Sequence, residues 1–258
     1  IGLNGAAGVT IILNGELVNM PVQNLYQLLY SLPVDRLKNV EVMYSAPAKY
    51  HVSGAVINIV LKTPRAIDGL SGQAMLGYTQ ARYPSYNGTL AATYAVGDWA
   101  FDVNWSLSRS KTWNRQETVS RHLVDGKRVT IDDDMRQLGR NLSNLLYASV
   151  SYKKLKLTYN GQINTDAENK SLSTGTLGEY VNRYSYLLPT GYHNVALRYD
   201  APFGLSVGGD YTSYREHRQQ RLSKSGVPMV NAVNRQSIDC YHLYVDRQRQ
   251  FGKCQLNY

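Results

Sequence analysis

Residues 99–108 read WAFDVNWSLS, and this alternating pattern indicates the fold class of the chain. Large apolar side chains stand at the odd positions, and small or polar side chains stand at the even ones. Residues 155–164, LKLTYNGQIN, repeat the arrangement. The side chains of a β-strand alternate between two faces with a period of two. A strand of about ten residues with one apolar and one polar face fits the wall of a transmembrane β-barrel.

Seven segments follow this alternation, and the links between them alternate between short and long. The predicted strands are residues 69–79, 86–96, 99–108, 142–152, 155–164, 192–200 and 203–213, with weaker ones near 237–247 and 250–258. Tight turns are predicted at 97–98, 153–154 and 201–202, and long loops over 110–141, 165–191 and 214–236. Outer-membrane barrels combine short periplasmic turns with longer extracellular loops. The spacing therefore predicts residues 67–258 as part of an antiparallel transmembrane β-barrel, incomplete here with about nine strands.

The apolar faces of these strands are predicted to meet lipid. They end in aromatic residues such as Tyr78, Trp99 and Tyr152, as the girdles of membrane barrels do. The opposite faces carry polar residues such as Asp102 and Lys156, which suit a wet lumen. The alternative is a soluble barrel, which would bury the apolar face inside. No run approaches the roughly 18 apolar residues of a membrane helix, so transmembrane helices are excluded.

Residues 1–66 differ from the rest and predict a small α+β unit. Asn14-Gly15 lies between two apolar runs and indicates a tight hairpin, because both central residues need a positive φ. Leucines at helical spacing predict a helix over 24–31. Alternation predicts strands over 37–44 and 54–62.

Four stretches of this unit carry a resemblance to a known family: ILNGELVNM (12–20), VDRLKNVEV (34–42), SAPAKY (45–50) and GAVINIVLK (54–62). Together they resemble the plug domain of TonB-dependent outer-membrane receptors. The chain reads YSAP at 44–47 where that family usually has Arg-Gly-Pro, and YH at 50–51 where it usually has Tyr-Gly. With these departures, the sequence resembles the Bacteroidetes-type branch of the family.

The resemblance implies a fold and a function. Residues 1–66 would be the C-terminal part of a plug inside a barrel of about 22 strands, so the chain is expected to be a fragment. The whole protein would bind a scarce nutrient (a ferric siderophore, glycan, peptide or cofactor) at the outer membrane of a Gram-negative bacterium. It would import the nutrient by TonB-dependent energy coupling through a segment before these residues. Outer-membrane lipid and a surface lipoprotein are further implied partners.

Composition and motifs narrow the alternatives. The formal net charge is +9, but the basic residues lie mostly between the strands, so no nucleic-acid partner is predicted. The five histidines show no metal-ligand spacing, and no catalytic motif is present, so neither a metal site, a cofactor nor an enzyme is predicted. The pairing of Cys240 with Cys254 stays open. With 21 tyrosines, a soluble glycan-binding β-module is an alternative, as is an adhesin or signalling receptor on the same scaffold.

The candidate ligand-binding residues lie in the predicted loops and the plug. Arg115, Arg121 and Arg128 belong to the link 110–141, and Arg218 and Arg221 belong to the link 214–236. A cationic vestibule would concentrate an anionic ligand, whereas contact with lipopolysaccharide phosphates or plain solvation of the charges are the alternatives.

Two further candidates, Tyr50 and His51, lie on a predicted plug loop. Either they contact the ligand or they pack that loop against the barrel wall.

Overall fold

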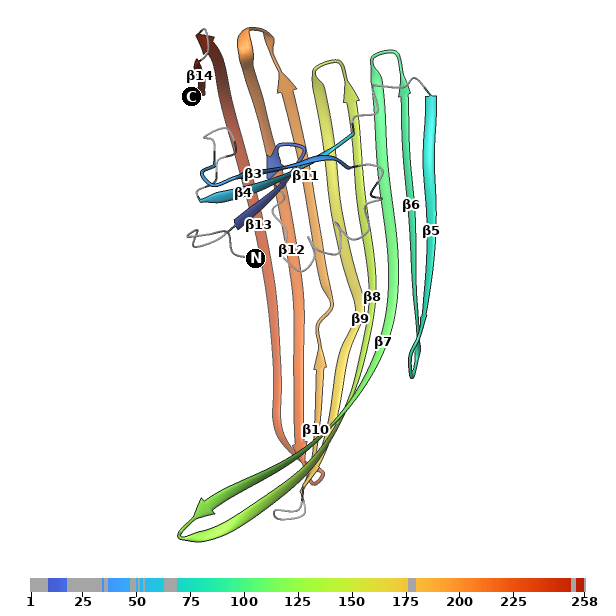
Figure 1. Ribbon diagram of the computed structural model, residues 1–258, viewed down its shortest axis with the longest axis vertical. Helices are drawn as coiled ribbons and strands as arrows, with labels where there is room; N and C mark the ends of the chain where they lie inside the picture. The colour runs from blue at the N-terminus through green and yellow to red at the C-terminus, as the bar shows by residue number, and fades with distance from the viewer. Residues whose placement is uncertain are drawn as a thin grey trace.

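The computed structural model describes most of the 258-residue chain as β-strand (Figure 1). The described residues are 9–17, 34, 37–46, 50, 52, 54–62, 69–175, 180–251 and 254–257. They form two sheets, one of four strands and one of ten. Among them no helix is long and apolar enough to cross a membrane.

The small sheet has the order β2-β1-β4-β3 and confirms the strands predicted near the N-terminus. Its strands are β1 (Val9–Leu13), β2 (Glu16–Leu17), β3 (Leu37–Met43) and β4 (Ala55–Leu61). The predicted hairpin at Asn14-Gly15 is confirmed, with φ values of 52° and 80°. The Asn14 side chain accepts a hydrogen bond from the backbone N–H of Leu61 at 2.7 Å, which ties this turn to β4. The predicted helix over 24–31 lies outside the described residues.

The large sheet is antiparallel throughout. Its strands are β5 (Gly69–Gln80), β6 (Pro84–Val96), β7 (Trp99–Val124), β8 (Lys127–Tyr152), β9 (Leu155–Gly175), β10 (Tyr180–Leu187), β11 (Thr190–Asp200), β12 (Leu205–Lys224), β13 (Val227–Phe251) and β14 (Cys254–Asn257). Both β10 and β11 pair with β9 and β12, one after the other, so the ten strands take nine places in the sheet. The mainly β fold is thus as predicted, and the tight turn at 201–202 includes a short 3-10 segment, Pro202–Gly204.

The long loops predicted over 110–141, 165–191 and 214–236 are wrong, because most of these residues continue the strands as long hairpins. Asp125-Gly126 closes one hairpin with φ values of 49° and 74°, and Ser225-Gly226 closes another with 49° and 85°. Two successive positive φ values match the twist of a tight hairpin. Backbone pairing between neighbouring strands continues up to these turns, although the apolar–polar alternation of the side chains has ended.

A junction crosses the large sheet where the predicted strands end and the long hairpins begin. The register of β8 and β9 shifts between Arg140 and Leu142, and Asp166 takes a positive φ of 54° there. In the neighbouring place, the interruption between β10 and β11 falls at residues 188–189. A β-bulge increases local twist, and Figure 1 shows the β7–β8 hairpin curling away beyond this level.

We call the part between the tight turns and the junction the proximal half, and the part beyond it the distal half. The proximal half comprises residues 69–111, 140–165, 189–216 and 236–251. The distal half comprises residues 112–139, 166–175, 180–188 and 217–235.

The two faces of the large sheet differ in what covers them. We call the face that carries Trp105 the outer face and the face that carries Asn104 the inner face. The small sheet lies across the inner face of the proximal half (Figure 1), where Leu145 and Tyr147 pack against Ile11, Leu13 and Leu61. Asn104 is therefore fully buried, whereas Trp105 is 40 % exposed.

Cys240 is free and exposed, and its register partner is Thr212, whereas Cys254 pairs in register with Phe251.

Candidate functional site

The inner face of the proximal half carries buried polar side chains that bond across the strands. Gln162 donates to Ser143 on the neighbouring strand and to Asn164 on its own strand, at 3.3 Å in each case. Asn164 in turn donates to the hydroxyl of Thr190 at 2.9 Å. Gln162 is only 1 % exposed, so these bonds offset much of the cost of taking its amide out of water.

A second network runs along the same face toward β13. Asn160 donates to Asn194 at 3.4 Å, and Asn194 donates to Thr212 at 2.8 Å and to Asp210 at 3.3 Å. The other carboxylate oxygen of Asp210 lies 3.2 Å from Nδ1 of His242. The two networks give the inner face of the proximal half two groups of hydrogen-bonded polar side chains.

A cavity of about 610 Å³ lies between the two sheets, near the tight turns. The small sheet contributes Lys38, Glu41 and Asn58 to its lining, and the large sheet contributes Asp102, Lys156, Arg198, Asp200 and Asp246 among others. Within the small sheet, Asn58 donates to Glu41 at 2.8 Å and accepts from the backbone N–H of Gly15 at 3.0 Å. The sheets therefore meet through an apolar cluster on one side and a charged cavity on the other.

Tyr50 borders this cavity, but most of its side chain is buried in the small sheet. It is 8 % exposed and packs with Ile12 and Val56. These contacts lie within the small sheet, and both a ligand contact of Tyr50 and its packing against the barrel wall stay predictions. His51 lies outside the described residues.

Arg218 is the candidate arginine that the register places on the inner face. It forms an ion pair with Glu216 at 3.0 Å, and its guanidinium carbon lies 5.8 Å from the ring centre of Tyr186. The hydroxyl of Tyr214 donates to Glu216 at 2.7 Å. Tyrosines, a carboxylate and a guanidinium thus meet just beyond the small sheet, where a ligand could stack and form hydrogen bonds.

The other candidate arginines lie on the outer face of the distal half, on strands rather than in loops. The register places Arg115 opposite Arg136, Arg121 opposite Thr130 and Arg128 opposite Leu123. On β12, Arg221 lies opposite Asn231. Four of the five candidate arginines therefore lie on the face opposite to that covered by the small sheet.

Arg115 and Asp134 form the best-defined ion pair of this region, with bonds at 2.9 and 3.3 Å. Asp134 also pairs with Arg136 at 2.9 Å. The hydrogen bond from Arg115 is the main reason why the pKa of Asp134 is lowered.

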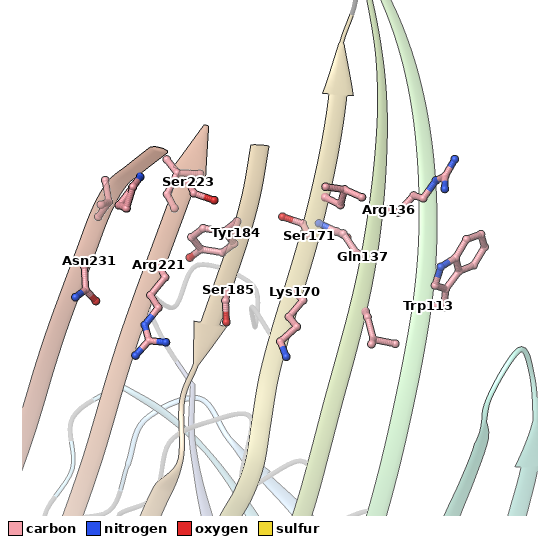
Figure 2. A pocket seen from close by; sticks show the side chains of 15 residues that line it. Trp113, Arg136, Gln137, Lys170, Ser171, Tyr184, Ser185, Arg221, Ser223 and Asn231 are labelled. Atoms are coloured by element: carbon pink, nitrogen blue, oxygen red, sulfur yellow. The ribbon is translucent and has the colours of Figure 1, made fainter. Parts of the chain in front are cut away.

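A cavity of about 670 Å³ lies in the distal half and spans β7 to β13 (Figure 2). Its lining combines basic and apolar side chains, with Arg136, Lys170 and Arg221 among the first and Trp113, Leu138 and Leu172 among the second. By register all six belong to the outer face.

The sequence could have revealed more of these features. Asp125-Gly126 and Ser225-Gly226 are dipeptides typical of tight hairpin turns, and they indicate the two long hairpins. The inner-face amides follow directly from the predicted alternation. Tyr214, Glu216 and Arg218 lie two residues apart on one strand, so alternation places them on one face. The approach of Arg218 to Tyr186, by contrast, depends on strand register, which the sequence alone does not specify.

Among the described residues no group of three or more potential metal ligands occurs. In comparisons with known proteins, no family model and no curated protein matches the sequence.

Proposed function

We propose that this chain is part of an outer-membrane receptor, in which the large sheet is a section of a β-barrel wall and the small sheet belongs to a plug. The observation that carries the proposal is the inverted burial of the large sheet. Its apolar face is open, with Leu76, Leu157 and Leu197 all at least 46 % exposed, whereas its polar face is covered. In water, burial of each such side chain would contribute about 1.5–3 kcal/mol. Because a whole domain is stable by only about 5–15 kcal/mol, a continuous face of this kind favours a lipid environment.

Aromatic side chains at the turn end of the outer face support this orientation. The rings of Trp99 and Tyr152 lie 4.6 Å apart, and Trp99 stacks on Phe101 at 5.9 Å. Lys153 in the tight turn lies 5.3 Å from the ring centre of Tyr152 and 3.6 Å from Asp98. A girdle of aromatic rings followed by charges fits the boundary between hydrocarbon and water.

The length of the apolar segment supports a fixed orientation of the strands across the membrane. Between Trp99 and Leu107 the outer face of β7 is apolar, and Arg109 follows. About nine residues of a tilted strand cross the hydrocarbon layer. The tight turns would then face the periplasm, and the distal hairpins would project from the cell.

The plug assignment draws on the resemblance of residues 12–62 and on the position of the small sheet. The small sheet meets the large one through a small apolar cluster and a charged cavity, and the cavity would keep part of the interface wet when the small sheet is pulled. We propose that binding of a scarce nutrient outside is followed by TonB-dependent displacement of this plug. The ligand would meet the inner face near Tyr186, Tyr214 and Arg218.

The membrane location is tested by fractionation of cells that produce the full-length protein. We expect it in the outer-membrane pellet after carbonate extraction, with an electrophoretic mobility that changes on heating. Solubility without detergent would contradict the proposal and favour the glycan-binding module.

The transport function is tested with a deletion strain under separate limitation for iron, glycans, peptides and cofactors. We expect slower growth under one limitation, and rescue only in cells with a working energy-coupling complex. Normal growth under every limitation, together with lost surface attachment, would support an adhesin.

A further inference from the structure

The two faces of the distal half differ in charge. The outer face carries charged side chains such as Arg136 and Lys170. On the inner face, one uncharged row of register partners crosses the sheet from β7 to β13 and consists of Thr112, Gly139, Asn169, Tyr186, Gln220 and Ala232. The next row, through Tyr184, runs from Asn114 to Val230 and is uncharged as well. We call these two rows the neutral patch.

Two tyrosine rings lie within the neutral patch. The ring centres of Tyr184 and Tyr186 are 6.4 Å apart, and the ring planes are within 11° of parallel. A tyrosine ring offers a flat apolar face and a polar tip. The C–H face of a pyranose ring can pack on such a surface while its hydroxyl groups stay available for hydrogen bonds. Two neighbouring parallel rings therefore suit a chain of sugar units.

Amide and hydroxyl groups surround the two rings. Asn114, Gln137 and Asn169 are exposed to solvent. Gly139 lies between Thr112 and Asn169, and a Cβ at this glycine would lie only 2.5 Å from Oγ1 of Thr112 and 2.7 Å from Oδ1 of Asn169. The glycine thus lets a hydroxyl group and an amide group approach each other across β8. Amide and hydroxyl side chains both donate and accept hydrogen bonds, which matches the hydroxyl groups of a sugar.

The charges around the neutral patch do not favour an anionic ligand. Arg218, in the next row toward the junction, already pairs with Glu216 at 3.0 Å. Arg115 and Arg136 lie on the other side of the sheet. An anion that leaves water needs cations in exchange, and the two rows supply none. A peptide would bring charged termini, which the neutral patch does not complement either.

We propose that the nutrient is an uncharged oligosaccharide, which binds the neutral patch. Its sugar rings pack on Tyr184 and Tyr186, and its hydroxyl groups form hydrogen bonds with Asn114, Gln137 and Asn169. The inference rests on the proposed function, because only a receptor open to the outside presents this face to a nutrient. It selects one class of ligand by the chemistry of the inner face.

The test is a binding array probed with the full-length protein in detergent. The array carries neutral oligosaccharides (glucans, mannans, xylans and galactans), their sulfated counterparts, ferric siderophores and oligopeptides. We expect at least one neutral series to bind, with an affinity that high salt hardly changes, because no charge takes part. Sulfation of that series should weaken binding by about tenfold, because the added charge loses water without gaining a cation.

Variants separate the rings from their surroundings. Y184A/Y186A should weaken binding of the neutral series by about tenfold or more, because both stacking surfaces are lost. Y184F/Y186F, which keeps the rings, should retain most of the affinity. The matched control W113A removes an aromatic ring from the outer face of the distal half and should leave the affinity unchanged.

Each other result would overturn the proposal. The unaltered protein alone decides against it if it binds no neutral series, or if it prefers a siderophore, a sulfated glycan or a peptide, so the test survives a variant that fails to fold. Equal losses in Y184A/Y186A and W113A would remove the neutral patch from the binding site. Fractionation separates the two levels. A protein in the outer membrane that ignores neutral glycans overturns this inference alone, whereas a soluble protein that binds them through Tyr184 and Tyr186 overturns the membrane proposal alone.

Discussion

The proximal and distal halves of the large sheet share their strands but follow different sequence rules. In the proximal half of β7, alternation separates apolar side chains such as Val103 from buried polar ones such as Asn104. In the distal half, alternation separates charged side chains such as Arg115 from neutral ones such as Asn114. One backbone ladder runs through both.

Strand continuity and side-chain burial are therefore set by separate features of the chain. Hydrogen bonds between β7 and β8 continue to the turn at Asp125-Gly126 whatever the side chains are. Burial depends on what meets each face, and only the proximal half has the small sheet on one side. The stability of the distal half therefore depends on its turns and ion pairs. The stability of the proximal half depends on what covers its two faces.

A charged residue introduced on the outer face should give the largest difference in unfolding free energy between the two halves. Val103 lies in the middle of the apolar band, and Val119 lies on the same face of the same strand in the distal half. Val103→Lys should cost about 2–4 kcal/mol of unfolding free energy in lipid vesicles, because the ammonium enters hydrocarbon. Val119→Lys, which stays in water, should change it by about 0.5 kcal/mol or less. Denaturant titration measures both, and equal effects would contradict the difference between the halves.

Loss of an inner-face amide should have the next largest effect. Asn194 is 3 % exposed and bonds to Asn160, Thr212 and Asp210. Asn194→Ala leaves buried polar groups without that partner, so it should cost about 1–3 kcal/mol. Asn114→Ala, at an exposed inner-face position of the distal half, is the matched control and should be nearly neutral. A small effect at Asn194 would show that water replaces the network easily.

A change in the distal turn should loosen only the distal half. Gly126 has a φ of 74°, so Gly126→Ala should cost about 1–2 kcal/mol locally. We expect amide hydrogen exchange in residues 116–132 to rise about tenfold. Exchange in residues 99–107 should not change. Asp125→Asn, which tolerates the left-handed conformation, serves as the control, and loosening of both halves would argue that they unfold together.

Prediction from sequence succeeded where hydrophobicity carried the signal. The alternation at residues 99–108 and 155–164 gave the proximal strands and their faces, and Asn14-Gly15 gave the small hairpin. Alternation between charged and neutral side chains carries no such signal, so the sequence alone predicts loops over the distal parts of β7 and β8. A loop assignment also gives Arg115 no face, whereas the register of β7 and β8 places it on the outer face; its role in ligand binding stays a prediction.

Acidification should give the smallest effect, and it concerns the distal half. The hydrogen bond from Arg115 holds the pKa of Asp134 below its ordinary value. A lowered carboxyl pKa means that the ion pair stabilises the hairpin above the ordinary carboxyl pKa, and that this contribution is lost as pH falls through the lowered value. Hydrogen exchange corrected for the intrinsic pH effect should therefore rise near residues 115 and 134 in that window. Asp134→Asn should remove the pH dependence. High salt should weaken the pair at neutral pH as well, because both side chains are open to solvent and their attraction is screened. If Asp134→Asn keeps the full sensitivity to acid, other carboxylates such as Glu117, which also pairs with Arg115 at 2.6 Å, carry it and Asp134 does not. Only a hairpin that ignores both acid and salt would be held by its backbone ladder and turn alone.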